Sequence, residues 1–154
     1  MDLSSILTPD AIRVSMNTSS KKRLLQDMAD IAGQVHGLPA QAVYEAMQER
    51  ESLGPTGMGG GVAIPHARLP QLDRVVGLFA SLALPVDFEA LDRRPVDLVF
   101  VLLAPAEAGA EHLRALARVS RTLRDATICG KLRSATNAAA LYALMTDESA
   151  SQAA

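Results

Sequence analysis

Hydrophobic and polar residues alternate along the chain in two rhythms, one with the period of a helix and one with the period of a strand. An apolar face with helical spacing predicts an amphipathic helix that begins after candidate N-cap residues at 17–20 and ends near Gly37. This face consists of Leu24, Leu25, Met28, Ile31, Ala32 and Val35. Pro39 suits the first turn of a second helix, which continues to about Arg50.

Three longer segments have the pattern of β-strands. Ile12–Met16 alternates apolar and polar residues, Val75–Leu84 is largely apolar up to Pro85, and Val96–Leu103 is the most apolar stretch of the chain. We expect Val96–Leu103 to be a central strand. Short connections at 85–86 and 92–95 indicate antiparallel pairing of neighbouring strands.

Helical periodicity returns in the last third of the chain. A helix is predicted to begin around Glu111. Its expected apolar face consists of Leu113, Leu116, Ala117, Ser120 and Leu123. Two shorter helices follow, one capped by Thr127 and continuing through Leu132 and a last one capped by Asn137.

Helices and strands interleave, so the fold class is α/β with α+β character. We expect a single domain over residues 1–146, built on a mixed sheet of roughly five strands with helices on both faces. Residues 147–154 are small and polar, and we expect them to form a disordered tail.

Composition excludes several classes of protein. The net charge of −2, from 15 basic and 17 acidic residues, argues against non-specific nucleic-acid binding, which requires a basic patch. The one cysteine, Cys129, cannot form an internal disulfide and fits a buried structural role in a reducing compartment. No apolar run reaches the ~20 residues that span a bilayer, and no basic signal segment opens the chain. We therefore expect a cytoplasmic protein without membrane insertion.

The most unusual stretch is residues 54–68, which read Gly-Pro-Thr-Gly-Met-Gly-Gly-Gly-Val-Ala-Ile-Pro-His-Ala-Arg. Val62–Ile64 predicts a short strand after the glycines, which places His66 at a strand end, where functional residues are common. Composition alone supports a mobile linker followed by a structural histidine about equally well.

Glycine-rich nucleotide motifs and metal sites do not fit this stretch. A P-loop requires lysine where Gly60 stands, and a dinucleotide fingerprint requires the order strand, loop, helix. Zinc sites draw closely spaced histidines or cysteines, whereas the three histidines here lie far apart in the sequence. We expect no metal.

His66 and His112 remain as the candidate chemical centre. A neutral imidazole nitrogen is a nucleophile near pH 7, because histidine titrates near ~6.5. A phosphohistidine would need donors to its oxygens, and Arg50, Thr56 and His112 could supply them. Arg50 also has a simpler interpretation as a cation at a helix C-terminus. Arg68 is predicted to be a surface charge on the opposite face from His66.

These residues follow one another in a specific order: Arg50-Glu51-Ser52-Leu53-Gly54-Pro55-Thr56-Gly57, then Gly61-Val62-Ala63-Ile64-Pro65-His66-Ala67, then His112. Their order and spacing resemble the active-site signature of the type-2 IIA proteins of the bacterial phosphotransferase system. These are the fructose/mannitol IIA domains and their nitrogen-regulatory relative, which this chain resembles most. The resemblance extends over roughly residues 3–146. Two positions depart from the family. Pro55 stands where the family usually has Ser or Thr, and Gly60 stands where a polar residue is common.

The resemblance implies a phosphotransferase component in which His66 accepts a phosphoryl group as a transient phosphohistidine. His112 would be its active-site neighbour and Arg50 would support the pair, with Thr56, Gly57 and Gly59 in the loop at the phosphoryl oxygens. It implies a phosphorylated HPr-like protein as donor, regulatory protein targets in nitrogen or potassium physiology, and no cofactor. The family's fold, a five-stranded mixed sheet between helices, agrees with the fold expected above.

Two alternative functions stay open at this point. The protein could be a stand-alone sugar-specific IIA component that relays phosphate to a fructose/mannitol-type IIB domain, or a non-catalytic interaction module with structural histidines. For the regulatory function, we expect a small apolar rim around His66 where an added charge would alter partner binding. Its expected members are Met58, Ala63, Ala67 and Leu69.

Overall fold

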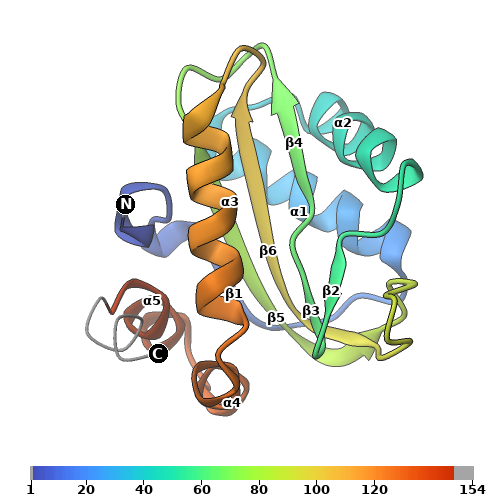
Figure 1. The fold of residues 1–154 in the computed structure, drawn as a ribbon, viewed down its shortest axis with the longest axis vertical. Helices are drawn as coiled ribbons and strands as arrows, with labels where there is room; N and C mark the ends of the chain where they lie inside the picture. The colour runs from blue at the N-terminus through green and yellow to red at the C-terminus, as the bar shows by residue number, and fades with distance from the viewer. Residues whose placement is uncertain (1, 148–154) are drawn as a thin grey trace.

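The computed structural model describes residues 2–147, which fold around a mixed sheet of six strands (Figure 1). The strands are β1 (Ile12–Met16), β2 (Gly57–Gly59), β3 (Val62–Ala63), β4 (His66–Leu69), β5 (Val76–Val86) and β6 (Val96–Pro105). Their order is β1-β5-β6-β3-β2, and β4 also pairs with β6. β1 runs parallel to β5, and β5 runs antiparallel to β6. β3 and β4 run parallel to β6, and β2 returns antiparallel to β3.

β3 and β4 lie along the same edge of β6 as two parts of one interrupted strand. Val62 faces Leu98 in β3, and His66 faces Leu102 in β4, so the register is continuous across the gap. Pro65 lies in the gap and has no N–H to donate to a strand partner. The sheet is thus five strands wide, with β6 at its centre, as the sequence predicts.

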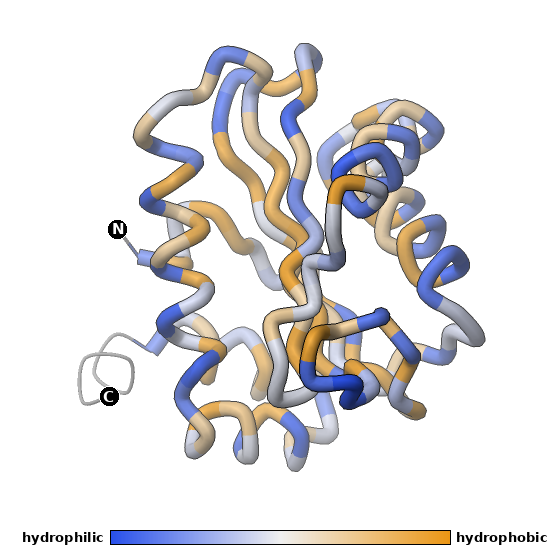
Figure 2. The backbone as a smooth tube through the Cα atoms, turned by 45° about the vertical axis from the view of Figure 1, so that its right-hand side comes forward, coloured by the Kyte–Doolittle hydropathy of each residue, from blue (hydrophilic) through white to orange (hydrophobic). Residues whose placement is uncertain are grey.

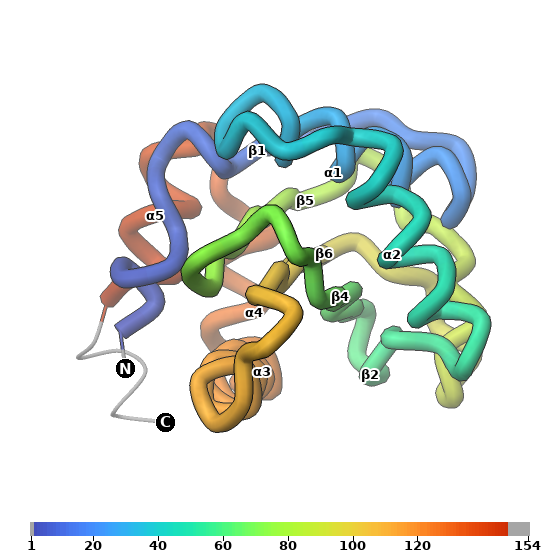
Figure 3. The backbone as a smooth tube through the Cα atoms, turned by 90° about the horizontal axis from the view of Figure 1, so that it is seen from above, coloured from blue at the N-terminus to red at the C-terminus, as the bar shows by residue number. Residues whose placement is uncertain are grey.

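Helices cover both faces of the sheet. Helices α1 (Lys21–His36) and α2 (Ala40–Ser52) lie on one face, and α3 (Ala110–Leu123) lies on the other (Figure 3). Two shorter helices, α4 (Ala126–Ser134) and α5 (Ala138–Thr146), follow α3, and α5 packs against β1. Two 3₁₀ turns, at Leu3–Ser5 and Pro9–Ala11, precede β1.

Side-chain caps begin three of the helices. The Ser20 side chain accepts a hydrogen bond from the Arg23 N–H at the start of α1, and Gly37 ends that helix in the left-handed region with φ of 67°. Asn137 caps α5 as predicted. The cap of α4 is Asp125 and not Thr127, because the Asp125 carboxylate accepts from two N–H groups of the first turn.

Two expectations about the middle of the chain are wrong. β5 does not stop at Pro85 but continues to Val86, so β5 and β6 are joined by residues 87–95 rather than by two tight turns. Val86 still pairs with Val96 after an irregularity in the register, which accommodates the proline.

The buried face of α3 also differs from the expected one. It consists of His112, Ala115, Arg118, Val119, Thr122 and Leu123. Three polar side chains therefore face inward, whereas Leu113 is 63% exposed. Hydrophobic periodicity points to the wrong face here, because it counts Leu113 as a core residue and His112 as a surface residue.

The core lies between the sheet and its helices. Hydrophobic segments follow β5 and β6 through the middle of the molecule, whereas polar residues recur along the outer helices (Figure 2). Phe79 and Phe100 pack across β5 and β6 with ring centroids 6.2 Å apart. No helix in residues 2–147 is long and apolar enough to cross a membrane. From residue 148 onward, the expected tail lies outside the described residues.

Candidate functional site

His66 is the first residue of β4, directly after the interruption at Ile64 and Pro65. Its ring is half-buried, and its Nδ1 lies 2.9 Å from the carbonyl oxygen of Ile64. A carbonyl oxygen can only accept, so Nδ1 carries the proton in this hydrogen bond. Nε2 of the neutral ring therefore keeps its lone pair.

Arg50 lies in the last turn of α2 and reaches this second nitrogen. Its Nε donates to His66 Nε2 over 3.2 Å, and its Nη1 donates to the Gly54 carbonyl oxygen over 2.9 Å. Because a guanidinium can only donate, the first bond again requires a lone pair on Nε2. Two independent contacts thus select the same tautomer of His66.

His112 lies beside His66 in the first turn of α3. The two ring centroids are 5.8 Å apart and the ring planes are tilted by 50°. His112 is only 6% exposed. Its Nδ1 is buried and has no hydrogen-bond partner among residues 2–147. A buried polar atom without a partner is costly, so this nitrogen is an unsatisfied polar group beside His66.

Burial keeps both imidazoles neutral at pH 7. It is the largest cause that lowers the pKa of His66 below its usual value, and the nearby Arg50 charge lowers it further, whereas the Ile64 carbonyl opposes the change. Burial likewise lowers the pKa of His112, with smaller contributions from His66 and Arg68. The site therefore combines a neutral nucleophile of fixed tautomer, a guanidinium at its lone pair and a second neutral imidazole. Such a set suits the transfer of an anionic electrophile.

Thr56 lies at the start of the glycine stretch, and its polar groups are bound to a carboxylate. Its backbone N–H and its hydroxyl lie 2.7 Å and 2.8 Å from carboxylate oxygens of Glu51. Donation to a phosphoryl oxygen would require the hydroxyl to leave Glu51. The assignment of Thr56 to the phosphoryl oxygens stays a prediction.

The glycines have a packing reason of their own. A Cβ at Gly57 would lie 2.9 Å from the Ala90 Cβ, and Gly59 has φ of 91° with the Asp92 carboxylate beside it. Gly60 also has a positive φ, of 67°, and its N–H donates to Asp92 over 2.9 Å. These glycines let the β2–β3 hairpin turn tightly against the 87–95 connection. A role for Gly57 and Gly59 at the phosphoryl oxygens stays a prediction.

Two expectations about the surroundings of His66 are wrong. Arg68 is two residues further along β4, so it lies on the same face as His66 and not on the opposite one. The apolar rim is also largely absent, because Ala63, Ala67 and Leu69 are buried. Leu53 at the end of α2 and Leu113 beside His112 are exposed instead, at 82% and 63%.

Sequence reasoning gave no role to Glu51 and Lys21. Glu51 is 7% exposed although it is charged, and Lys21 Nζ lies 3.3 Å from its carboxylate. The sequence offers one signal for Glu51, which is its place directly after Arg50 in the motif. Nothing in the sequence could place Lys21, which approaches from α1.

Comparisons with known proteins show the family of this chain. The family described as "Phosphoenolpyruvate-dependent sugar phosphotransferase system, EIIA 2" matches residues 5–148. The chain is 48% identical over 145 residues to a nitrogen regulatory protein of Bradyrhizobium diazoefficiens, covering 94% of this chain and 95% of that protein. It is 34% identical over 134 residues to a fructose-specific EIIA component of Haloferax volcanii, covering 85% and 86%.

A solved structure shows the same fold at similar length. The nitrogen regulatory protein IIA-Ntr of Neisseria meningitidis superposes with a TM-score of 0.88 and is 35% identical, covering 94% of this chain and 99% of that one. The resemblance expected from the arginine, the glycines and the two histidines is therefore confirmed. The chain belongs to the type-2 EIIA family of the phosphoenolpyruvate-dependent sugar phosphotransferase system, and its relatives include the nitrogen regulatory proteins.

Proposed function

We propose that this protein is a regulatory phosphocarrier that accepts a phosphoryl group on Nε2 of His66. The observation that carries the proposal is the pair of hydrogen bonds on the His66 ring, from Nδ1 to Ile64 and to Nε2 from Arg50. Together they leave one nitrogen as a nucleophile and put a cation beside it. Membership of the type-2 EIIA family supports the same assignment.

The proposed step moves one phosphoryl group between two imidazoles. The lone pair of His66 Nε2 attacks phosphorus on a donor phosphohistidine, a new N–P bond forms, and the donor N–P bond breaks with its electrons returning to the donor ring. The His66 ring then carries positive charge, which its Nδ1–H shares with the Ile64 carbonyl. No proton has to leave His66, so no general base is required.

Arg50 and His112 are proposed to hold the phosphoryl oxygens. When Nε2 is occupied, the Arg50 Nε–H loses its acceptor and can donate to a phosphoryl oxygen, for which a guanidinium is well shaped. A phosphoryl oxygen would also supply the missing partner of His112 Nδ1. Both bonds form with the transferring group and favour the transition state.

The proposed donor is a phosphorylated HPr-like carrier protein, and the proposed output is regulation of partner proteins. The 48% identity to a protein named nitrogen regulatory protein supports a nitrogen-regulatory output. A second candidate is sugar relay to a fructose-type IIB domain, which the 34% identity to a fructose-specific EIIA component supports.

Phosphorylation would change the charge of a surface that can dock partners. The group adds about −1.5 to −2 charge. Leu53 and Leu113, exposed close to Arg50 and His112 in the chain, offer apolar contact area there. A regulatory partner that covers these leucines would have to desolvate the added charge, so we expect phosphorylation to weaken at least one complex of the unmodified form.

Intact mass after incubation with the phosphorylated carrier tests the phosphocarrier function. Wild-type protein should gain one phosphoryl group that is labile in acid and stable in alkali, as a phosphoramidate is. His66→Ala should fold and gain none, whereas His36→Ala, which changes a histidine in another part of the fold, should still be modified. Full modification of His66→Ala would overturn the assignment.

Cells that carry His66→Ala or His66→Glu separate the two candidate outputs. The regulatory function predicts altered nitrogen or potassium physiology with normal growth on fructose and mannitol. Loss of sugar uptake with unchanged regulation would instead favour sugar relay.

A further inference from the structure

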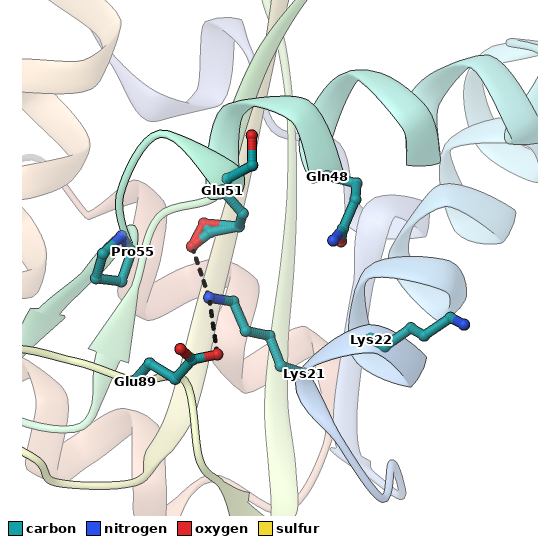
Figure 4. A pocket seen from close by; sticks show the side chains of 7 residues that line it. Lys21, Lys22, Gln48, Glu51, Pro55 and Glu89 are labelled. Carbon is teal, nitrogen blue, oxygen red and sulfur yellow. Dashed lines mark ion pairs between the residues drawn. The ribbon is translucent and has the colours of Figure 1, made fainter.

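The Glu51 carboxylate lies buried at the end of α2, directly after Arg50 in the chain. It accepts hydrogen bonds from the Thr56 backbone N–H and from the Thr56 hydroxyl, and it pairs with Lys21 Nζ at 3.3 Å. Lys21, Glu51 and Glu89 face one another from three different segments (Figure 4). They border a hollow of about 390 Å³ that is not lined by His66, Arg50 or His112.

One chain of hydrogen bonds runs from Glu51 to Nδ1 of His66. Glu51 holds the Thr56 N–H, the Thr56 carbonyl oxygen accepts from the Ile64 N–H over 3.0 Å, and the Ile64 carbonyl oxygen accepts from His66 Nδ1. The carbonyl that selects the tautomer is therefore held in place through the peptide that Glu51 binds.

A second chain of hydrogen bonds runs from Glu51 to Nε2 of the same ring. The Glu51 backbone carbonyl accepts from the Gly54 N–H over 3.1 Å, and the Gly54 carbonyl accepts from Arg50 Nη1. Arg50 Nε then donates to His66 Nε2. Only the first chain begins at the Glu51 carboxylate, through Thr56, whereas this one begins at the Glu51 backbone carbonyl and does not involve the side chain.

Lys21 places a cation against the buried Glu51 carboxylate. A charge taken out of water is stabilised when it is paired and hydrogen-bonded. The Lys21 side chain is only 18% exposed, its Nζ lies 4.7 Å from the centre of the Phe88 ring, and it donates to the Phe88 carbonyl over 3.4 Å. Its contact with Glu89 is longer, at 3.9 Å, and that carboxylate is 76% exposed.

We propose that Glu51, paired with Lys21, is a positioning residue whose carboxylate holds Thr56 and so sets the tautomer of His66. The proposal rests on the proposed phosphoryl transfer to His66. It assigns no contact between Glu51 and the phosphoryl group. The Glu51 side chain acts through Thr56, on the geometry of the unmodified site.

Glu51→Gln tests the role, with Glu89→Gln as its matched control. Both variants replace a carboxylate that contacts Lys21, but only Glu51 contacts the loop. We expect Glu51→Gln to lower the single-turnover phosphorylation rate at saturating phosphorylated carrier about tenfold, since a misplaced reacting group costs rate. The carrier concentration for half-maximal rate should change less than twofold, and Glu89→Gln should match wild type in both.

The imidazole nitrogen signals of His66 give a readout that a merely structural role would not move. In ¹⁵N-labelled wild type we expect one tautomer, with the proton on Nδ1. Glu51→Gln should show a mixture of the two tautomers in a protein with wild-type circular dichroism. A wild-type rate together with a single tautomer in Glu51→Gln would overturn the positioning role.

Lys21 variants keep the proposal testable where Glu51→Gln does not fold. Lys21→Met should slow transfer as Glu51→Gln does, and Lys21→Arg should restore most of the rate. Lys22→Met removes the neighbouring lysine, which is exposed and points away from Glu51 (Figure 4), and should leave transfer unchanged. Equal rates in Lys21→Met and Lys22→Met would contradict the role.

Wild-type protein that accepts no phosphoryl group would instead overturn the phosphocarrier function itself, so the two failures are distinguishable.

Discussion

Arg50 Nε lies 3.2 Å from His66 Nε2 and donates a hydrogen bond to the only lone pair of that ring. The guanidinium thus occupies the position from which a phosphoryl group would approach, and it is the first donor that such a group would meet. The same contact lowers the pKa of His66, after the larger effect of burial, and keeps the ring neutral. Under the proposed function, Arg50 would therefore keep His66 neutral before transfer and face the phosphoryl charge after it.

Removing Arg50 or His112 should slow phosphoryl transfer without abolishing it. Each would donate one charge-assisted hydrogen bond, and losing such a bond costs on the order of 1.5–3 kcal/mol. Arg50→Ala and His112→Ala should therefore transfer roughly tenfold to a hundredfold more slowly in single-turnover assays. Arg124→Ala, at an exposed arginine after α3, is the control. A wild-type rate for His112→Ala would leave His112 with a structural role only.

Folding stability should fall as the pH drops below about 6.5. The pKa of each of the three histidines is lowered, in all three cases mainly by burial, from a usual value of 6.5. Between the folded and unfolded pKa values, the unfolded chain binds a proton that the folded chain does not. Stability is therefore complete above that window and is lost as the pH falls through it.

Chemical unfolding between pH 7.5 and 5 measures this loss. His66→Gln and His112→Gln should each reduce the drop in the free energy of unfolding, because neither variant has an imidazole to protonate at that position. A free energy of unfolding that rises on acidification through this window would contradict the buried neutral histidines.

Glycine substitutions should have opposite effects at two positions. A Cβ at Gly57 would lie 2.9 Å from the Ala90 Cβ, so Gly57→Ala should destabilise the protein by about 1–3 kcal/mol. Gly130 lies inside α4 with open space around it, so Gly130→Ala should stabilise by about 0.4–1 kcal/mol. Denaturant midpoints compare the two variants. Equal effects at both positions would show that close packing against Ala90 does not explain Gly57.

Leu113 should contribute to docking of the phosphorylated carrier. Leu113→Ala should raise the carrier concentration for half-maximal transfer severalfold while the saturating rate stays near wild type, because it removes contact area and no donor. Leu84 is similarly exposed, at 70%, on β5, and Leu84→Ala serves as control. A concentration dependence that changes equally in both variants would exclude a specific docking role.

The sequence predicts most of the fold because its elements carry local signals. The helix ending at Gly37, the central strand from Val96 and the cap at Asn137 all follow from periodicity or capping chemistry. Pro85 wrongly indicates the end of a strand, because an irregular register lets β5 continue past it. The face of α3 misleads as well, because His112, Arg118 and Thr122 are buried polar residues that a hydrophobic pattern assigns to solvent.

The site was predictable only in part, for a physical reason. His66 and His112 are identified by residue type and Arg50 by the family resemblance, and the structure brings the three together. The connection from Lys21 through Glu51 to Thr56 depends on contacts between α1, α2 and the glycine stretch, which no local pattern encodes. The close approach of Ala90 to Gly57 is equally non-local.

The most direct test of the central claim is the position of the phosphoryl group on the His66 ring. Long-range ¹H–¹⁵N correlation spectra of the phosphorylated protein, with ¹⁵N-labelled histidine, identify which nitrogen carries phosphorus. We predict phosphorus on Nε2 of His66, with the proton retained on Nδ1 toward the Ile64 carbonyl. Phosphorus on Nδ1, or on His112, would contradict the geometry on which the phosphocarrier function is proposed.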